Sequence, residues 1–232
     1  MIINSRRARP DAYTKLLIHP QGANLSTVFR DSSQSGHIIT ANGDVNISTA
    51  YGYFSDRSIY FDGTGDYLTV PDSDDWTWGA SNTVDLRVWP SSNATLNNEY
   101  TLFSHGADGN HGWRLSWFGS GSGNSRKVQI HWNQEIGLIA SGITSNQLTL
   151  DAWNHVAVVK NGATNVSVYL NGTSGLSSTI DKEMDNFTGL MHIGQIAFSL
   201  GVQPHYGYMD EIRISNGIAR WTSNFTPPTR RY

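Results

Sequence analysis

The stretch Ser58–Pro71, SIYFDGTGDYLTVP, constrains the fold of this chain more than any other. Ile59 and Phe61 alternate with serine and tyrosine, which is the period-two pattern of a strand with one buried face. The Asp-Gly-Thr-Gly sequence at 62–65 then predicts a tight turn, because glycine adopts positive φ at little cost. Tyr67–Val70 resumes an extended run that a proline ends. We therefore predict a β-hairpin here.

The same pattern of short apolar runs and polar turns recurs along the chain, and no amphipathic helix of ten or more residues is predicted. Many short strands without helices require a sandwich or a barrel. We predict an all-β fold, a two-sheet antiparallel jelly-roll sandwich. Besides the two strands of the hairpin, the expected strands are Leu16–Ile18, Val28–Phe29, Ile38–Thr40, Val45–Ile47, Thr83–Trp89, Thr101–Ser104, Gly112–Phe118, Lys127–Asn133, Trp153–Val159, Val166–Leu170, Leu190–Ile193 and Gly207–Ile214.

The composition agrees with one large β-domain and limits which classes of partner are expected. Only 15% of the 232 residues are charged and 23 are glycine, while 8 Trp, 10 Tyr and 8 Phe can fill a core. A net charge of −3 gives no reason to expect a nucleic-acid partner. With no cysteine, the chain has no disulfide and no thiolate for metal binding or catalysis.

The chain shows no targeting or membrane segment. No run approaches the ~18 apolar residues that span a membrane. The N-terminus, MIINSRRARP, has arginines but no apolar stretch behind them, so no signal peptide is expected. We divide the chain into an N-terminal arm (1–10), a sandwich domain (11–228) and a C-terminal tail (229–232). The arm is either a solvated extension or an anchor in an assembly.

Five segments occur in a fixed order along the chain. They are YFDGTGDYLTVP (60–71), VDLRVWP (84–90), DAWNHVAVVKNGATNVSVYLNG (151–172), HIGQ (192–195) and YMDEIRISNGIARW (208–221). Together they resemble the laminin-G-like, concanavalin A-like lectin/glucanase superfamily, in its stand-alone bacterial and phage form. The resemblance covers nearly the whole chain and implies the concanavalin A-like sandwich. The ending DEIRIS, followed by an aromatic residue and FTPP, resembles copies found in phage structural proteins.

The resemblance implies a structural Ca²⁺. An Asp at the position of Asp210 often lends it a carboxylate in the family, and Ca²⁺ takes several oxygen ligands at ~2.3–2.6 Å. Asp31 and Asp62 are further candidates from their turn context. The alternative is that Asp210 caps a turn or pairs with Arg213.

The carboxylates argue against catalysis. Hydrolytic members of the superfamily carry closely spaced carboxylates on one strand, because glycoside cleavage needs two of them about 5–10 Å apart. The four glutamates, Glu99, Glu135, Glu183 and Glu211, are far apart in sequence. Asp210 and Glu211 are neighbours, which on a regular strand point to opposite faces. We therefore expect no enzymatic activity.

A binding surface remains as the expected functional element. Sugars stack on aromatic faces and hydrogen-bond to amides and carboxylates. Residues at polar-facing or loop positions of the predicted strands are the candidates, although any of the tryptophans could instead belong to the core. They are Trp89, Trp113, Trp117, His131, Asn133 and Tyr206.

Two functions follow as hypotheses. In the first, the chain is a non-enzymatic phage virion protein on the particle surface, a head decoration or a tail or fibre subunit. It would contact other virion proteins or further copies of itself, and would bind a host surface polysaccharide. In the second, it is a soluble bacterial carbohydrate-binding lectin module that works outside the cell or at its surface. An aromatic groove would favour the lectin, and a flat apolar patch would favour the assembly role.

Overall fold

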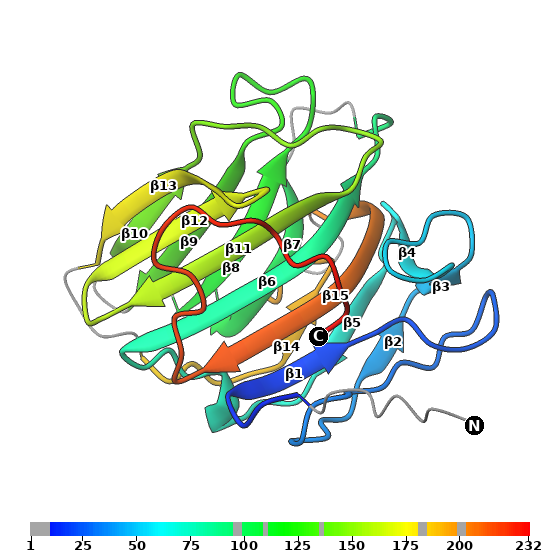
Figure 1. The fold of residues 1–232 in the computed structure, drawn as a ribbon, viewed down its shortest axis with the longest axis horizontal. Helices are drawn as coiled ribbons and strands as arrows, with labels where there is room; N and C mark the ends of the chain where they lie inside the picture. The colour runs from blue at the N-terminus through cyan, green and yellow to red at the C-terminus, as the bar shows by residue number, and fades with distance from the viewer. Residues whose placement is uncertain (1–9, 95–98, 109–110, 135–136, 181–184, 199–202) are drawn as a thin grey trace, which may run out of the picture.

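Two antiparallel sheets pack face to face (Figure 1), which confirms the predicted sandwich. The computed structural model describes residues 10–94, 99–108, 111–134, 137–180, 185–198 and 203–232. One sheet has eight strands and the other has seven. Most of the predicted arm lies outside the described residues.

One short 3₁₀ turn, η1, accompanies the strands, and the described residues contain no α-helix. The elements are β1 (Thr14–Ile18), β2 (Thr40–Asn42), β3 (Asn46–Ser48), β4 (Ser58–Asp62), β5 (Tyr67–Val70), η1 (Asp74–Trp76), β6 (Ser81–Pro90), β7 (Glu99–Asp108), β8 (His111–Phe118), β9 (Val128–Gln134), β10 (Gly137–Ile143), β11 (Asn154–Asn161), β12 (Asn165–Leu170), β13 (Thr173–Thr179), β14 (Met191–Ile193) and β15 (Tyr206–Asn216). The eight-stranded sheet has the order β13-β12-β11-β6-β15-β4-β3, with β1 also paired to β15. The seven-stranded sheet has the order β10-β9-β8-β7-β14-β5-β2.

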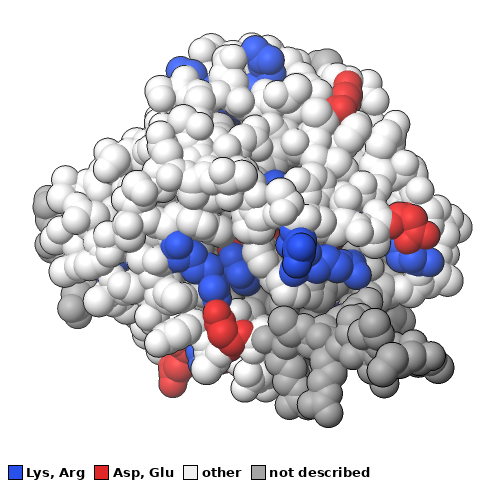
Figure 2. All heavy atoms as spheres, viewed as in Figure 1, with Lys and Arg blue, Asp and Glu red and all other residues white. Residues whose placement is uncertain are grey.

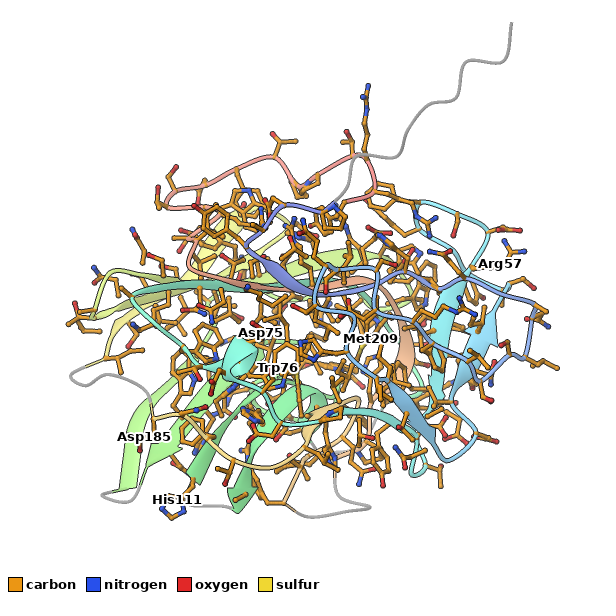
Figure 3. The ribbon with its side chains drawn as sticks, turned by 90° about the horizontal axis from the view of Figure 1, so that it is seen from below. Arg57, Asp75, Trp76, His111, Asp185 and Met209 are labelled. Carbon is orange, nitrogen blue, oxygen red and sulfur yellow. The ribbon has the colours of Figure 1, made fainter. Side chains whose placement is uncertain are left out.

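The core lies between the two sheets. In the view of Figure 3 the sheets form two layers, and the fully buried Met209 of β15 lies between them. On β9, where a strand was predicted, Val128, Ile130 and Trp132 are buried, while His131 and Asn133 stay partly exposed. Apolar residues that alternate along each strand therefore give each sheet its inner face.

The predicted hairpin at 58–71 is wrong in its pairing, although both strands exist. β4 pairs with β3 and β15 in one sheet, whereas β5 pairs with β2 and β14 in the other. The turn therefore carries the chain from one sheet to the other. Asp66 holds this crossing, since its carboxylate accepts hydrogen bonds from the backbone N–H of Asp62 (3.0 Å) and Asp44 (2.8 Å). Gly63 and Gly65 supply the positive φ that the turn needs.

Residues 217–232, which we name the C-terminal strap, cover the outer face of the eight-stranded sheet (Figure 1). Trp221 and Phe225 of the strap stack on each other with ring centroids 4.1 Å apart. They pack against Ala157, Val159 and Tyr169 on the outer face of β11 and β12. β11 is therefore apolar on both faces, and the strap covers its outer face.

A buried charged network lies under the strap. The Asp85 carboxylate accepts two hydrogen bonds from Arg213, at 2.9 and 3.2 Å, and lies 3.3 Å from His155 Nε2. Tyr232 donates its hydroxyl to the same carboxylate, and the Arg213 guanidinium lies 3.4 Å from the centre of the Tyr232 ring. Tyr232, in the segment 229–232 that was predicted to be a tail, is therefore part of this network.

Candidate functional site

An aromatic site lies on the outer face of the eight-stranded sheet. Strand register builds it, because Tyr208 on β15 is directly opposite Trp89 on β6 and also opposite Tyr60 on β4. Residues opposite one another in a sheet project on the same side. Tyr206 precedes Tyr208 by two positions, and Tyr51 reaches the site from the loop before β4. We name these five residues the aromatic cradle.

Four of the five rings of the aromatic cradle contact one another beside a hollow of about 190 Å³ that all five residues line. Tyr51 lies 4.5 Å from Trp89 and 5.0 Å from Tyr208, and Tyr60 lies 4.9 Å from Tyr208, between ring centroids. Tyr51 is 45% exposed. The site therefore offers aromatic surface to solvent on a base of three paired strands.

Polar groups complete the rim of the hollow. Ser91, Asn93 and Asp151 line it. One oxygen of Asp151 accepts a hydrogen bond from the backbone N–H of Ser92 at 2.9 Å, which fixes the side chain. Burial and neighbouring tyrosines raise the pKa of Tyr60 and of Tyr208, so both phenols stay protonated at neutral pH. The site thus combines aromatic faces with a hydroxyl, an amide and a carboxylate.

Two of the six residues predicted for sugar binding, Trp89 and Tyr206, meet in the aromatic cradle. Sequence reasoning missed Tyr51, Tyr60 and Tyr208. The alternation around Ile59 and Phe61 already placed Tyr60 on the outer face and could have identified it. Tyr51 lies outside any strand, and no sequence pattern marks it.

The expectation that Trp113 and Trp117 face solvent is wrong. They are 1% and 0% exposed, on the inner face of β8 with Leu115 between them. Trp113 packs on Phe103, and Trp117 donates its indole N–H to His205 Nδ1 at 3.3 Å. Because core packing covers their rings, neither tryptophan presents a face to a ligand.

His131 and Asn133 lie on the outer face of the other sheet, apart from the aromatic cradle. His131 Nε2 lies 3.2 Å from Asn133 Oδ1, and on the neighbouring strands Arg114 forms an ion pair with Glu99 at 2.9 Å. Burial and the Arg114 charge lower the pKa of His131, which is therefore neutral at pH 7. The six predicted residues therefore do not form one site.

The surroundings of Asp210 agree in part with the structural Ca²⁺ that the resemblance implies. It is fully buried at a β-bulge of β15, and its Oδ2 has no hydrogen-bond partner among the described residues. Burial and the adjacent Glu211 raise its pKa to about 7. Glu211 has positive φ (50°) and bonds to Arg231 at 3.1 Å, so this strand is not regular. A cation would offset the buried charge of Asp210.

The other two predicted ligands lie in different surroundings. Asp31 accepts hydrogen bonds from the backbone N–H of Leu17, Ser33 and His37, so its carboxylate organises a turn. Asp62 lies with Asp44 and Asp66, the only group of three possible metal ligands among the described residues. Asp31, Asp62 and Asp210 therefore do not share one metal site in the described part of the chain.

The fold and the aromatic cradle together define a lectin-like sandwich domain. The chain belongs to the concanavalin A-like lectin/glucanases superfamily, whose family model matches residues 62–221. This confirms the resemblance seen in the sequence. No curated protein matches the chain.

Solved structures with the same fold are distant in sequence. The binding domain of Paraclostridial Mosquitocidal Protein 1 is 16% identical in sequence, with a TM-score of 0.69. The alignment covers 89% of this chain and 49% of that protein chain. The binding domain of botulinum neurotoxin serotype G is 15% identical in sequence, with a TM-score of 0.66. That alignment covers 89% of this chain and 48% of the toxin chain. The chain thus spans about half of these toxin domains.

A third structure matches over almost its whole length. Domain 4 of AbnA, an extracellular arabinanase from Geobacillus stearothermophilus in complex with arabinotriose, is 20% identical with a TM-score of 0.64. The alignment covers 95% of that domain and 90% of this chain. These similarities show the fold. Among the described residues, no helix is long and apolar enough to cross a membrane.

Proposed function

We propose that this chain is a non-catalytic carbohydrate-binding domain whose sugar site is the aromatic cradle. The observation that carries the proposal is the row of Trp89, Tyr208 and Tyr60 across three paired strands, with Tyr51 and a polar rim beside it. The C–H faces of a sugar stack on such rings, and an amide and a carboxylate bond its hydroxyls. The arabinotriose complex of the similar arabinanase domain supports the same class of ligand.

Glycan-array binding followed by calorimetry tests the proposal. We expect saturable binding to one class of oligosaccharide, weakened about tenfold by Trp89→Ala, since one stacked ring contributes about 1.4 kcal/mol. Tyr13→Ala is the matched control, because Tyr13 is 47% exposed and does not line the hollow. Equal binding by the wild type and Trp89→Ala would exclude the aromatic cradle as the site.

We propose that the domain does not cleave its ligand, because the glutamates that the structure describes are engaged in ion pairs. Glu99 is paired with Arg114, and Glu211 is buried with His19 at 2.8 Å and Arg231 at 3.1 Å. Glu135 and Glu183 lie outside the described residues. We expect no new reducing ends after prolonged incubation with any polysaccharide that binds. Sustained release of reducing ends by purified protein would overturn this.

A structural Ca²⁺ at Asp210 is a further part of the proposal. The buried, unpartnered Oδ2 of Asp210 is the observation that supports it. Ca²⁺ would hold the carboxylate in its charged form and stiffen the β-bulge. Ca²⁺ should therefore raise the unfolding temperature of the wild type but not of Asp210→Asn. The same increase in both proteins would place the ion elsewhere.

For the biological setting we propose the surface of a phage particle, with other virion proteins as neighbours. The support is the likeness of the 210–228 ending to phage structural proteins, and this ending forms most of the strap. Mass spectrometry of purified particles should detect the chain as a stoichiometric component. If it occurs only in the bacterial medium or at the cell surface, the soluble lectin module is the better description.

A further inference from the structure

A second hollow lies where the strap crosses the end of β15. It measures about 520 Å³ and opens widely to solvent. Figure 2 shows lysine and arginine side chains gathered across the middle of this face. We name it the arginine hollow after the charged and aromatic residues that line it, Arg213, Arg220, Arg230, Arg231, Trp221 and Tyr232.

The carboxylates near the arginine hollow are already engaged. Arg213 bonds to Asp85 at 2.9 Å and Arg231 to Glu211 at 3.1 Å. Arg220 bonds to Asp11 at 2.9 Å. Three of the four guanidinium groups that line the hollow are thus already paired with carboxylates.

Arg230 is the fourth arginine of the hollow. It is exposed, and no ion pair or hydrogen bond of its side chain is found within the part of the chain that the structure describes. An arginine can donate two parallel N–H groups to a carboxylate or a sulfate, which a lysine cannot do. The arginine hollow therefore has an available donor fork at its rim for an anionic group.

A run of rings connects the arginine hollow to the aromatic cradle along the same sheet face. Trp89 of the cradle lies 5.9 Å from Trp153, which lies 5.8 Å from Tyr53. The Arg87 guanidinium lies 4.3 Å from the centre of the Tyr53 ring and donates to the strap carbonyl of Pro228. Packed rings and the buried Arg87 therefore link the two hollows on this face of the sheet.

We propose that the arginine hollow binds a carboxylate or sulfate group of an acidic polysaccharide, another sugar of which lies on the aromatic cradle. This inference rests on the proposed function and gives it a substrate class. A flexible polymer bound at two sites gains affinity because the second contact is intramolecular. A neutral polysaccharide could use only the cradle.

Matched pairs of polysaccharides test the proposal. Dextran sulfate is compared with dextran, and polygalacturonate with its carboxyl-reduced form, by calorimetry at two salt concentrations. We expect the acidic member of at least one pair to bind more tightly and to lose affinity with added salt. Arg230→Gln should weaken that binding about tenfold, the equivalent of one charge-assisted hydrogen bond. Binding of the neutral member should not change.

Control variants separate the two proposals. Arg126→Gln removes the same charge from a residue that does not line the hollow, and it should bind like the wild type. If Trp89→Ala weakens binding while Arg230→Gln does not, the arginine hollow is refuted and the cradle stands. If neither variant weakens binding to any pair, both fail. If Arg230→Gln and Arg126→Gln lose the same affinity, the attraction is a nonspecific charge effect and the arginine hollow is refuted. Tight binding of the wild type to anionic lipid vesicles would lead to the same conclusion.

Discussion

Replacing Asp85 with asparagine removes the buried carboxylate on which Arg213, His155 and Tyr232 converge. Asp85 is fully buried and the Arg213 side chain is 7% exposed. Asparagine keeps the shape but leaves the guanidinium without its counter-charge. Breaking a buried pair in this way costs about 3–5 kcal/mol. For a domain of this size, each kcal/mol lowers the melting temperature by about 2–4 °C, so we expect a loss of about 6–20 °C.

The pH dependence of this loss has a definite sign. Although burial opposes it, the charge of Arg213 and the hydrogen bond from His155 hold the pKa of Asp85 well below its usual range. A carboxyl with a depressed pKa contributes stability above its unfolded pKa, and that contribution disappears as the pH falls. The difference in unfolding free energy between wild type and Asp85→Asn should therefore be largest near neutral pH and shrink in acid.

Urea unfolding and calorimetry at pH 7 and at pH 3 measure both effects. Asp56→Asn is the matched control, because Asp56 is 70% exposed in its pair with Arg57 and such surface pairs contribute about 1 kcal/mol or less. A loss below about 1 kcal/mol for Asp85→Asn at pH 7 would refute the reasoning. So would a difference that grows as the pH falls.

Three further predictions concern Asp210, Gly172 and Phe225. In metal-free buffer, Asp210→Asn should be more stable than the wild type at pH 8 by about 4 kcal/mol at most. The reason is that a pKa raised from 3.8 to about 7 makes the folded wild type lose stability as the pH rises through that window; urea unfolding at pH 5 and 8 tests this. Gly172→Ala should destabilise the fold by more than about 1 kcal/mol, because φ is 79° and the new Cβ would meet the Phe225 carbonyl; thermal unfolding measures it. Phe225→Ala, at a partly exposed ring, should cost about 2 kcal/mol and speed proteolytic release of the strap; unchanged cleavage would contradict it.

The sequence predicted the sandwich well because period-two alternation reports which strand faces are buried. It did not predict the pairing at 58–71, because a hairpin and a crossing between sheets share the same local pattern of two strands and a glycine turn. β10 and β13 were missed for another reason. Each lies at the edge of a sheet, and β13 has a Gly- and Ser-rich sequence without clear alternation.

The candidate site was predicted in part. Trp89 and Tyr206 were found because they occupy polar-facing or loop positions of the predicted strands. The polar residues Arg114 and Ser116 alternate with Trp113 and Trp117, and this alternation already indicated that the two tryptophans point inward. Tyr51 joins the cradle through a loop, which no periodicity describes. The arginine hollow depends on a strap that folds back over strands far away in sequence, so local patterns could not predict it.

The position of the strap matters for anyone who trims this domain for expression. The family match ends at residue 221, before Phe225, Arg230 and Tyr232. A fragment cut at that boundary would keep every strand but lose half of the layer over β11 and the hydroxyl that reaches Asp85. Newly exposed apolar surface would then favour aggregation. Clones of related domains should therefore extend past the last strand to include the segment that corresponds to 222–232.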